Sequence, residues 1–401
     1  MEYLAKRVLK MSESETLAMT RIARELKAQG KDIISLSIGE PDFNTPEEVK
    51  NYAKQAIDNN WTHYPPVPGY PELREAISKK FKRDNNLNYS PEQIIVSTGA
   101  KQSIYQVVMS LVNPDDEVII PAPFWVSYKE IVKVAEGKCV FIKTALENDF
   151  KVTPAQLEAA ITNKTKLIMF SSPSNPTGML YTKDELKGIA EILSRHKNVF
   201  VMADEIYEHI NFQGKHESLA QYDEIKEQVI TINGVAKGFA MTGWRIGYIG
   251  APLAIAKACD KLQGQVTSAT CSIAQRAAIK AMEMNPQTSE DIISMRNKFK
   301  ERRDLMFTLL QEIPGLKTRL PQGAFYFFPE VNSYFGKKYD KYTINDSNDL
   351  TMYLLYEANV ALVSGAAFGD DNCIRFSYAT SNELLVEAMK RIKDALYKLQ
   401  F

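Results

Sequence analysis

The sequence predicts an α/β protein with a mainly parallel, doubly wound sheet and a smaller α+β domain. Short runs of apolar, often β-branched residues recur between residues 94 and 232, and helical segments or loops separate most of them. These runs are apolar almost throughout, which is typical of parallel strands covered by helices on both faces. Beyond about residue 282, long charged helical segments and isolated short strands replace this pattern. A second unit of different architecture is therefore expected there.

Composition and charge favour a folded protein that binds small molecules. The 401 residues are 45% hydrophobic and 24% charged, as in ordinary globular proteins, and at roughly 150 residues per domain they make two or three domains. Lysine plus arginine equals aspartate plus glutamate at 49 each, so the charge balance favours neither nucleic acid nor an anionic membrane as partner. We see no signal-peptide pattern and no apolar run near the ~18 residues of a membrane span, so we expect a cytoplasmic protein.

The cysteines and histidines give no metal-binding or disulfide pattern. The cysteines lie far apart, at Cys139, Cys259, Cys271 and Cys373. This spacing is unlike a zinc knuckle or a CxxC motif, so free thiols are expected. The histidines form no HxxxH or HExxH arrangement. We therefore predict no metal site.

The first 81 residues predict helices and short connecting elements. These are a helix ending at Gly30, a strand at Ile33–Leu36, a helix at Thr45–Ile57 with Pro46 in its first turn, and a helix at Pro71–Phe81. A loop of Gly, Pro and Asp residues contains Gly39. A second loop, rich in proline, displays Tyr64. That loop could be a simple connector or could present the tyrosine.

The central part of the chain predicts six strands. They are Ile94–Ser97, Val118–Ile120, Val140–Ile142, Leu167–Phe170, Val199–Ala203 and Val229–Ile232. In doubly wound sheets, ligands bind beyond the carboxyl ends of the strands. The residues that follow each strand are therefore the candidates for a functional site.

Polar and aromatic residues follow several of these strands. Gly99, Ala100 and Lys101 open a helix after the first strand, where free amides could bind a phosphate. The later positions are Trp125, Asn175, Asp204, Tyr207 and Lys237. Each has an ordinary alternative as a core aromatic residue, a turn residue or a strand cap. Taken together, they predict one site at one edge of the sheet.

Lys237 and Arg245 lie in a stretch, residues 231–248, that is rich in glycine and alanine. Small residues allow a backbone to turn sharply or to approach a bound group. A lysine amine in a partly desolvated pocket can attack a carbonyl carbon, and a guanidinium in an apolar run requires an anionic partner when it is buried. From this stretch alone, a strand cap at Lys237 and a peripheral ion pair at Arg245 are equally acceptable.

The C-terminal part predicts a smaller α+β unit. Its elements are a helix at Ser289–Leu310, a strand at Ala324–Phe328, a helix at Leu350–Glu357 and strands at Val360–Val363 and Cys373–Tyr378. Arg375 lies within the last strand, where alternation could direct it to solvent or into a cleft between the domains.

Eight motifs in this order resemble those of class I aminotransferases of the aspartate aminotransferase family, which use pyridoxal phosphate. The motifs are GEPDF, YPPVPGYPELREAI, STGAKQ, PFWVSY, SPSNPTG, DEIY, KGFAMTGWRIGY and IRFSYATS, and they span nearly the whole chain. The resemblance implies fold type I of the enzymes that use this cofactor. It also implies an N-terminal arm and part of the small domain at 1–46, a large cofactor-binding domain at 47–285, and the rest of the small domain at 286–401.

The resemblance also assigns expected roles to the candidate residues. Lys237 would form the imine with pyridoxal phosphate and then move the substrate proton, Asp204 would pair with the pyridine nitrogen, and Tyr207 and Asn175 would bind the ring hydroxylate. Trp125 would stack on the ring, while Arg245 and the amides of Gly99, Ala100 and Lys101 would bind the phosphate. Tyr64 would reach the phosphate of a neighbouring subunit, which implies a homodimer with shared sites. Arg375 and the backbone of Gly39 would bind the substrate α-carboxylate, with Trp125 and Asn175 also near the substrate.

Two departures from the family pattern affect the prediction. Gly234 occupies a position where many members have a hydroxyl residue that binds the phosphate, and the segment Val266–Ser272 lacks the arginine with which one subgroup binds acidic substrates. In the other subgroup a lysine binds the acidic side chain, and Lys101 fits that role, with Ser14 and Thr16 as further donors. The alternative for Lys101 is a solvated or phosphate-facing side chain.

The expected activity is amino-group transfer between L-aspartate and 2-oxoglutarate by a ping-pong mechanism. The small-molecule partners would be amino acids and 2-oxo acids. Alternatives are a prephenate/glutamate or aromatic aminotransferase, a β-lyase that uses the same cofactor, and a non-catalytic regulator.

Overall fold

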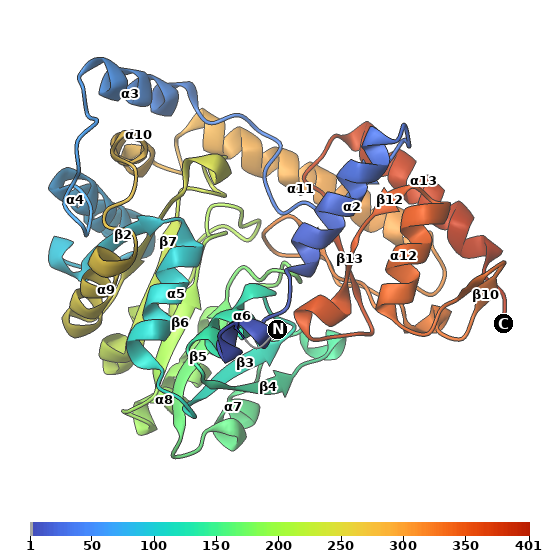
Figure 1. Ribbon diagram of the computed structural model, residues 1–401, viewed down its shortest axis with the longest axis horizontal. Coiled ribbons are helices and arrows are strands. Elements are labelled where there is room, and N and C mark those ends of the chain that lie inside the picture. Colours follow the sequence, from blue (N-terminus) through green and yellow to red (C-terminus); the bar gives the residue numbers. More distant parts are fainter. Residues whose placement is uncertain (1–2) are drawn as a thin grey trace.

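The computed structural model describes residues 3–401 and contains a seven-stranded central sheet beside a smaller region of helices and short strands (Figure 1). The strand order is β2-β8-β7-β6-β5-β3-β4. The bounds are β2 Ile94–Thr98, β3 Glu117–Ala122, β4 Lys138–Lys143, β5 Thr165–Ser171, β6 Phe200–Asp204, β7 Val229–Gly234 and β8 Ile246–Gly250. Every pairing is parallel except those that β8 makes with β2 and β7. The predicted mainly parallel sheet is confirmed.

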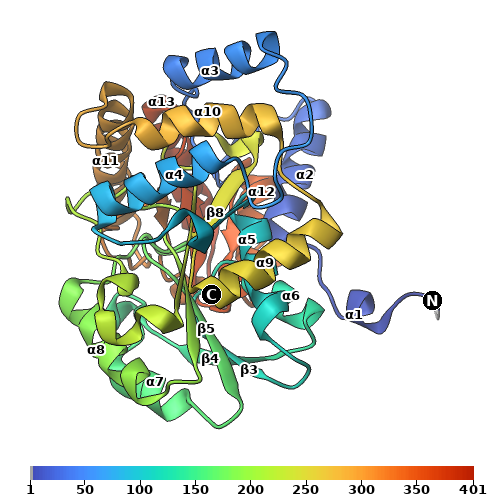
Figure 2. The same ribbon diagram turned by 90° about the vertical axis from the view of Figure 1, so that its left-hand side faces the viewer.

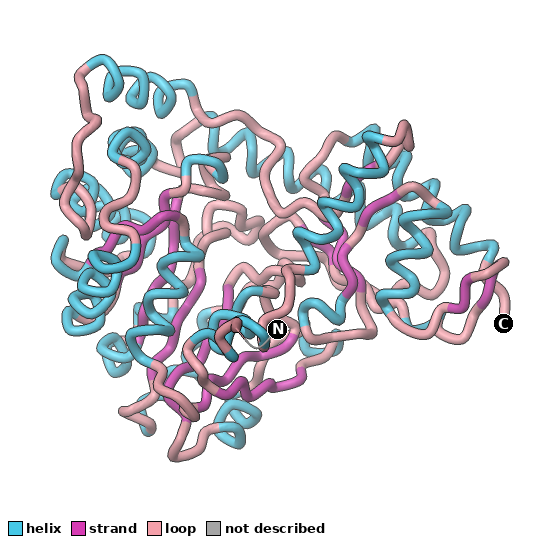
Figure 3. Tube along the Cα trace, viewed as in Figure 1, coloured by secondary structure: helices cyan, strands magenta, loops and turns pink. Residues whose placement is uncertain are grey.

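Helices cover both faces of this sheet. In Figure 3 the helices are cyan and the strands are magenta. On one face lie α5 Ala100–Leu111, α6 Ser127–Val134 and α9 Leu253–Val266, and on the other lie α3 Glu47–Asp58, α4 Pro71–Lys80, α7 Pro154–Ala160, α8 Lys183–Arg195 and α10 Ser272–Glu283. The side chains of β3 alternate between these layers. Val118 and Ile120 pack in the cluster of α5 and α6, whereas Ile119 packs in the cluster of α8. Burial on both faces explains why the inner strands read as continuous apolar runs, whereas most residues of the edge strand β4 are at least partly exposed.

Strand β8 was not among the predicted strands. Gly247 and Gly250 interrupt its apolar pattern, and glycine lowers strand propensity. The structure explains Gly247, because a Cβ there would lie 2.1 Å from the amide nitrogen of Ala100. The close packing of the start of α5 against β8 therefore requires the glycine that conceals the strand in the sequence.

The smaller region combines several short sheets with helices. Its helices are α11 Glu290–Gln311, α12 Ser347–Glu357 and α13 Asn382–Lys398, and its strands are β9 Tyr326–Phe327, β10 Lys338–Tyr339, β11 Tyr342–Thr343, β12 Val360–Ala361, β13 Val363–Ser364 and β14 Ile374–Ser377. The strand predicted at Val360–Val363 is thus two strands. β12 pairs with β1 (Ile34–Ser35) and β13 pairs with β14, so the chain changes sheets between them. This change of partner leaves no break in the apolar run.

The N-terminal segment contains α1 Lys6–Leu9 and α2 Glu15–Ala28. Helix α1 lies beyond α6 at the edge of the molecule (Figure 2), where the amide of Ser12 donates to Glu130 Oε2 at 3.0 Å. Pro46 was predicted inside the first turn of a helix, but it precedes α3 in extended conformation. Within residues 3–401, no helix is both long and apolar enough to cross a membrane. The four cysteines are free thiols, as predicted.

Candidate active site

A cavity of about 400 Å³ lies at the carboxyl ends of the parallel strands. Ser171 and Asp204, the last residues of β5 and β6, form part of its wall. Its lining includes the predicted residues Gly39, Ala100, Lys101, Trp125, Asn175, Asp204, Tyr207, Lys237, Arg245 and Arg375. Ser14 and Thr16 also line it. The structure therefore brings these candidates together around one space.

Lys237 lies in the turn that follows β7 and directs its amine into the cavity. Its Nζ donates a hydrogen bond to the carbonyl oxygen of Gly39. Burial lowers the pKa of Lys237 to about 8, and repulsion from Arg375 and Arg245 acts in the same direction. Roughly a tenth of this amine is therefore neutral at pH 7, and a neutral amine is a nucleophile and a proton acceptor.

Asp204 is a buried carboxylate at the end of β6. Its Oδ2 accepts a hydrogen bond from the Tyr128 hydroxyl at 2.9 Å, and its Oδ1 accepts one from the backbone amide of Ile206 at 3.2 Å. Burial raises the pKa of Asp204 to about 6. A carboxylate that is desolvated but held by two donors suits a cationic nitrogen, since such a partner would offset its burial. Tyr128 was not predicted as part of the site.

Tyr207 and Asn175 have different partners in the structure. The Tyr207 hydroxyl lies 2.8 Å from the hydroxyl of Tyr326, a residue of β9 that the sequence does not predict as part of the site. The Asn175 Oδ1 accepts a hydrogen bond from Arg375 Nη1 at 2.9 Å. Asn175 therefore connects to the predicted substrate-binding arginine, and Tyr207 connects to a second tyrosine.

Arg375 is 1% exposed and lines the cavity, so β14 directs it inward and not to solvent. Its Nη2 donates to the carbonyl oxygen of Ser37 at 2.7 Å. Its Nε is buried without a hydrogen-bond acceptor among residues 3–401, and no carboxylate pairs with the guanidinium there. Burial lowers the pKa of Arg375. A buried cation with an unused donor is a binding position for an anion.

The start of α5 and Arg245 form a cradle without side-chain bulk. Gly99 has φ +79°, and a Cβ on it would lie 2.2 Å from Arg245 Nη2. Arg245 is exposed, contrary to the buried guanidinium considered from the sequence, and its backbone adopts a left-handed conformation. Among residues 3–401, the N–H groups of Ala100 and Lys101 have no acceptor, whereas Gly99 N–H donates to Ser97 O at 2.8 Å. Two free amides and a guanidinium suit a phosphate.

Lys101 and Trp125 lie at the mouth of the cavity. The Lys101 amine is 5.0 Å from the centroid of the Trp125 ring. Desolvation and then repulsion from Arg245 lower the pKa of Lys101. Within residues 3–401 it forms no ion pair, so its charge is available to a ligand. Tyr64 lies away from this cavity and is 95% exposed.

A family model described as aminotransferase class I and II matches residues 31–392. The chain belongs to this family. It is 45% identical over 396 residues to an aspartate/prephenate aminotransferase of Cereibacter sphaeroides, with 98% of each chain covered. It is similar to the structure of the Rhizobium meliloti aspartate aminotransferase, with a TM-score of 0.95, 41% identity and 99% of each chain covered. It is also similar to the Thermus thermophilus aspartate aminotransferase with maleate, with a TM-score of 0.93, 39% identity and coverage of 98% of this chain and 100% of the other.

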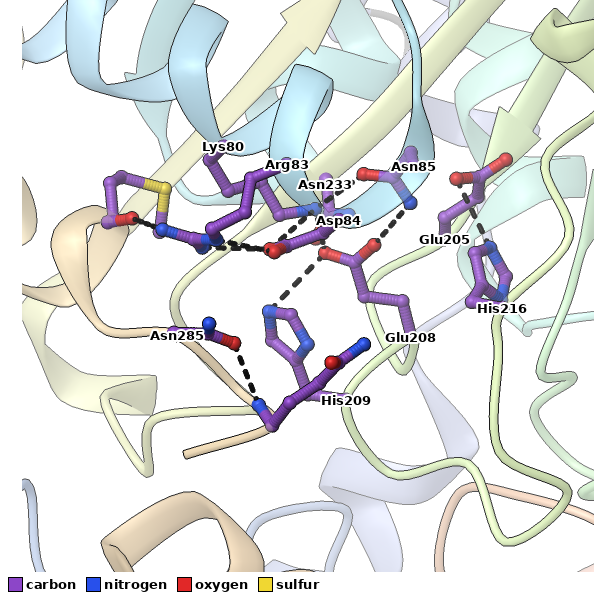
Figure 4. A network of polar contacts seen from close by, with 12 residues as sticks. Lys80, Arg83, Asp84, Asn85, Glu205, Glu208, His209, His216, Asn233 and Asn285 are labelled. Atoms are coloured by element: carbon purple, nitrogen blue, oxygen red, sulfur yellow. Dashed lines mark hydrogen bonds and ion pairs between the residues drawn. The ribbon is translucent and has the colours of Figure 1, made fainter. Parts of the chain in front are cut away.

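The aminotransferase fold of this chain contains a buried polar network beside the segment that carries Asp204 and Tyr207. Figure 4 shows Glu208 between Lys80, Asn85 and His209. Glu208 Oε1 accepts a hydrogen bond from Lys80, and its Oε2 accepts one from Asn85 Nδ2 at 2.8 Å. Burial alone would raise the pKa of Glu208, but the attraction of Lys80 holds it well below the ordinary value. Lys80 therefore supplies the counter-charge of this carboxylate.

The same network contacts the turn that carries Lys237. The His209 ring lies against Gly238, where a Cβ would be 2.7 Å from its Cδ2. Burial lowers the pKa of His209 to about 4, so the imidazole is neutral near neutral pH. Glu205 lies 3.1 Å from His216 Nε2, and its other oxygen accepts a hydrogen bond from Ser218 at 2.6 Å. These contacts hold the segment that runs from the end of β6 to residue 218.

Sequence reasoning missed Tyr128, Tyr326 and Lys80. Each stands in an ordinary pattern: the two tyrosines lie in apolar runs, and the lysine lies near the end of a charged helix. Only one signal was present in the sequence. Tyr128 falls inside the PFWVSY motif, three residues after Trp125, on the first turn of a helix that starts at the same sheet edge.

Proposed function

We propose that this aminotransferase moves the amino group between L-aspartate and 2-oxoglutarate by a ping-pong mechanism. One observation carries the proposal: a single cavity holds an amine of lowered pKa, at Lys237, together with two cations, Arg375 and Lys101, that have no carboxylate partner within residues 3–401. Two such cations suit a substrate with two carboxylates. The relatives named aspartate aminotransferase, and the Thermus protein with maleate, support the same assignment.

Pyridoxal 5'-phosphate is the cofactor that we propose for the cavity, and the residues present fit it. The cradle of Gly99, Ala100, Lys101 and Arg245 would hold its phosphate, because a Cβ at position 99 would fill that space. Asp204 would pair with its ring nitrogen, Tyr207 and Asn175 would bind its ring oxygen, and Trp125 would stack on its ring. When bound, this cofactor supplies an aldehyde for an amine and a ring that accepts electrons from the substrate carbon.

Lys237 has two tasks in this proposal. At pH 7 roughly a tenth of an amine with a pKa near 8 is neutral, so Lys237 can react with a carbonyl carbon without a separate base. After a substrate has displaced it, the same amine remains tethered beside the substrate α-carbon. It can then accept the proton from that carbon and return it at a neighbouring atom.

Arg375, Asn175 and Lys101 would orient the substrate. The Arg375 fork, held at Asn175 and Ser37, presents its free Nε to the α-carboxylate, and the Gly39 backbone lies at the same wall. Lys101 would bind the second carboxylate at the cavity mouth, with Ser14 and Thr16 nearby as hydroxyl donors. These assignments are our proposal for the substrate-binding residues.

We further propose a homodimer in which Tyr64 of one subunit completes the site of the other. Tyr64 is 95% exposed, so its side chain is accessible to a second subunit. A second cavity of about 630 Å³ shares Lys101 and Arg245 with the first, and it offers room beside the phosphate cradle. The division into 1–46, of which residues 1 and 2 lie outside the described part, 47–285 and 286–401 remains a proposal, as does a cytoplasmic location.

The test is a comparison of amino acceptors with the purified protein loaded with pyridoxal phosphate. Glutamate serves as donor, and oxaloacetate, prephenate and phenylpyruvate serve as acceptors. Oxaloacetate as the preferred acceptor supports the proposal. Prephenate is the second candidate, because the Cereibacter relative is named for both substrates. Preference for phenylpyruvate, or release of ammonia and pyruvate without any acceptor, would contradict the dicarboxylate assignment.

A further inference from the structure

Tyr326 belongs to the cavity wall and contacts residues of both the central-sheet region and the smaller region. It belongs to β9 in the smaller region, is 0% exposed as a residue, and still contributes to the cavity wall. Its hydroxyl is 2.8 Å from the Tyr207 hydroxyl, and its ring lies 4.5 Å from the Arg375 guanidinium carbon. A Cβ on Gly39 would lie 2.9 Å from the same hydroxyl. One buried side chain therefore contacts residues from both sides of the site.

The donors and acceptors of the two hydroxyl groups determine the role of Tyr326 when Tyr207 binds a ligand. A phenol has one O–H donor and can also accept. If the Tyr207 hydroxyl donates its hydrogen bond to a bound ring oxygen, it can no longer donate to Tyr326. The 2.8 Å contact between the two hydroxyls is then a hydrogen bond only if Tyr326 donates to Tyr207. An O–H group whose oxygen accepts a hydrogen bond is itself a stronger donor. Tyr326 would thus strengthen the bond that Tyr207 makes to the ligand.

The aromatic face of Tyr326 acts on a different partner. The Arg375 guanidinium carbon lies 4.5 Å from the centroid of this ring and 4.9 Å from that of the Phe368 ring. A cation over an aromatic face is attracted to it, and the effect is larger in a desolvated site. Arg375 has no carboxylate partner among residues 3–401, so these rings and the two carbonyl-type acceptors hold its orientation.

We propose that Tyr326 is a positioning residue that serves both binding functions: its hydroxyl orders the Tyr207 donor, and its ring holds Arg375 for the substrate carboxylate. This inference rests on the proposed function. The inference assigns different roles to the hydroxyl and to the ring of Tyr326, so two variants can distinguish these roles. Tyr326→Phe removes only the hydroxyl, whereas Tyr326→Leu removes the hydroxyl and the aromatic face.

The first readout is the pH titration of the visible absorbance of the protein loaded with pyridoxal phosphate. A donor to the ring oxygen stabilises its anionic form, so a weaker donor raises the pKa of the chromophore. A cooperative contribution of 10–30% to a charge-assisted bond corresponds to a rise of about 0.1 to 0.7 pH units in Tyr326→Phe. In a Tyr207→Phe background, the further change Tyr326→Phe is expected to have no effect.

The second readout is the affinity for succinate, a dicarboxylate without an amine. Tyr326→Phe keeps the ring and is expected to bind succinate as the parent protein does, whereas Tyr326→Leu is expected to bind it about 2- to 30-fold more weakly. An unchanged titration in Tyr326→Phe overturns the inference, and so does a shift that persists without the Tyr207 hydroxyl. A parent protein that shows no pH-dependent chromophore overturns the proposed function itself. Tyr326→Phe alone decides the hydroxyl role if the leucine variant does not fold.

Discussion

The change Glu208→Gln tests whether the buried network stabilises the fold beneath the site. The Glu208 and Lys80 side chains are 3% and 0% exposed. Glutamine keeps the shape of the Glu208 side chain but removes its negative charge. Loss of one partner of a buried ion pair costs about 3–5 kcal/mol. Asp84, 3.9 Å from the Lys80 amine, would retain part of the attraction and favours the lower end of this range. For 401 residues with an unfolding entropy of about 2.1 cal/mol/K each, this corresponds to a melting temperature lowered by about 3.5 to 6 °C.

The assay is thermal unfolding of the cofactor-free protein at pH 7. Because Lys80 holds the pKa of Glu208 below its unfolded value, the stabilisation is present above pH ~4.3 and is lost as pH falls further. The matched control is Glu47→Gln, which breaks an exposed pair with Lys50 and is expected to change the melting temperature by less than about 1 °C. Equal effects of the two substitutions would refute the importance of burial.

Three further predictions concern the site. Lys101→Ala is expected to lower kcat/KM for aspartate by about 10- to 100-fold and to change that for alanine little, since only aspartate has a second carboxylate; equal losses would contradict its role. Gly238→Ala places a Cβ 2.7 Å from His209 Cδ2 and is expected to destabilise the protein by about 1–3 kcal/mol in urea unfolding, with a smaller added cost when His209→Ser is also present. Because burial lowers the pKa of Lys237 to about 8, the rate at which pyridoxal phosphate binds the cofactor-free protein is expected to rise with pH, with its midpoint near pH 8, and to level off above that pH; a midpoint near 10 would contradict this environment.

The sequence predicted most of the central sheet because burial leaves a local pattern. Each of the six predicted strands carries its own apolar run, and the polar residues after them follow the rule that strand ends form ligand sites. Strand β8 escaped because Gly247 serves a contact with Ala100, which is distant in sequence. The split of Val360–Val363 into two strands escaped because a change of pairing partner leaves the run intact.

The site residues that escaped depend on contacts between distant segments. Lys80 bonds to Glu208, 128 positions later, so nothing near the lysine in the sequence indicates that it is buried. Tyr326 contacts Tyr207, in the turn after β6, and Arg375, in β14, so its contacts come from segments that are distant from one another in the sequence. Alternation in the last strand could not decide the direction of Arg375, because that depends on which face of a three-stranded sheet meets the cavity.

A single-turnover reaction with L-aspartate tests the central claim most directly. The purified protein, loaded with pyridoxal phosphate, is mixed with aspartate in the absence of any 2-oxo acid, and the products are counted per subunit. Our account predicts that about one oxaloacetate forms per site before the reaction stops, and that 2-oxoglutarate restarts it with formation of glutamate. Continued turnover without an acceptor, or no oxaloacetate at all, would contradict amino-group transfer from aspartate in this cavity.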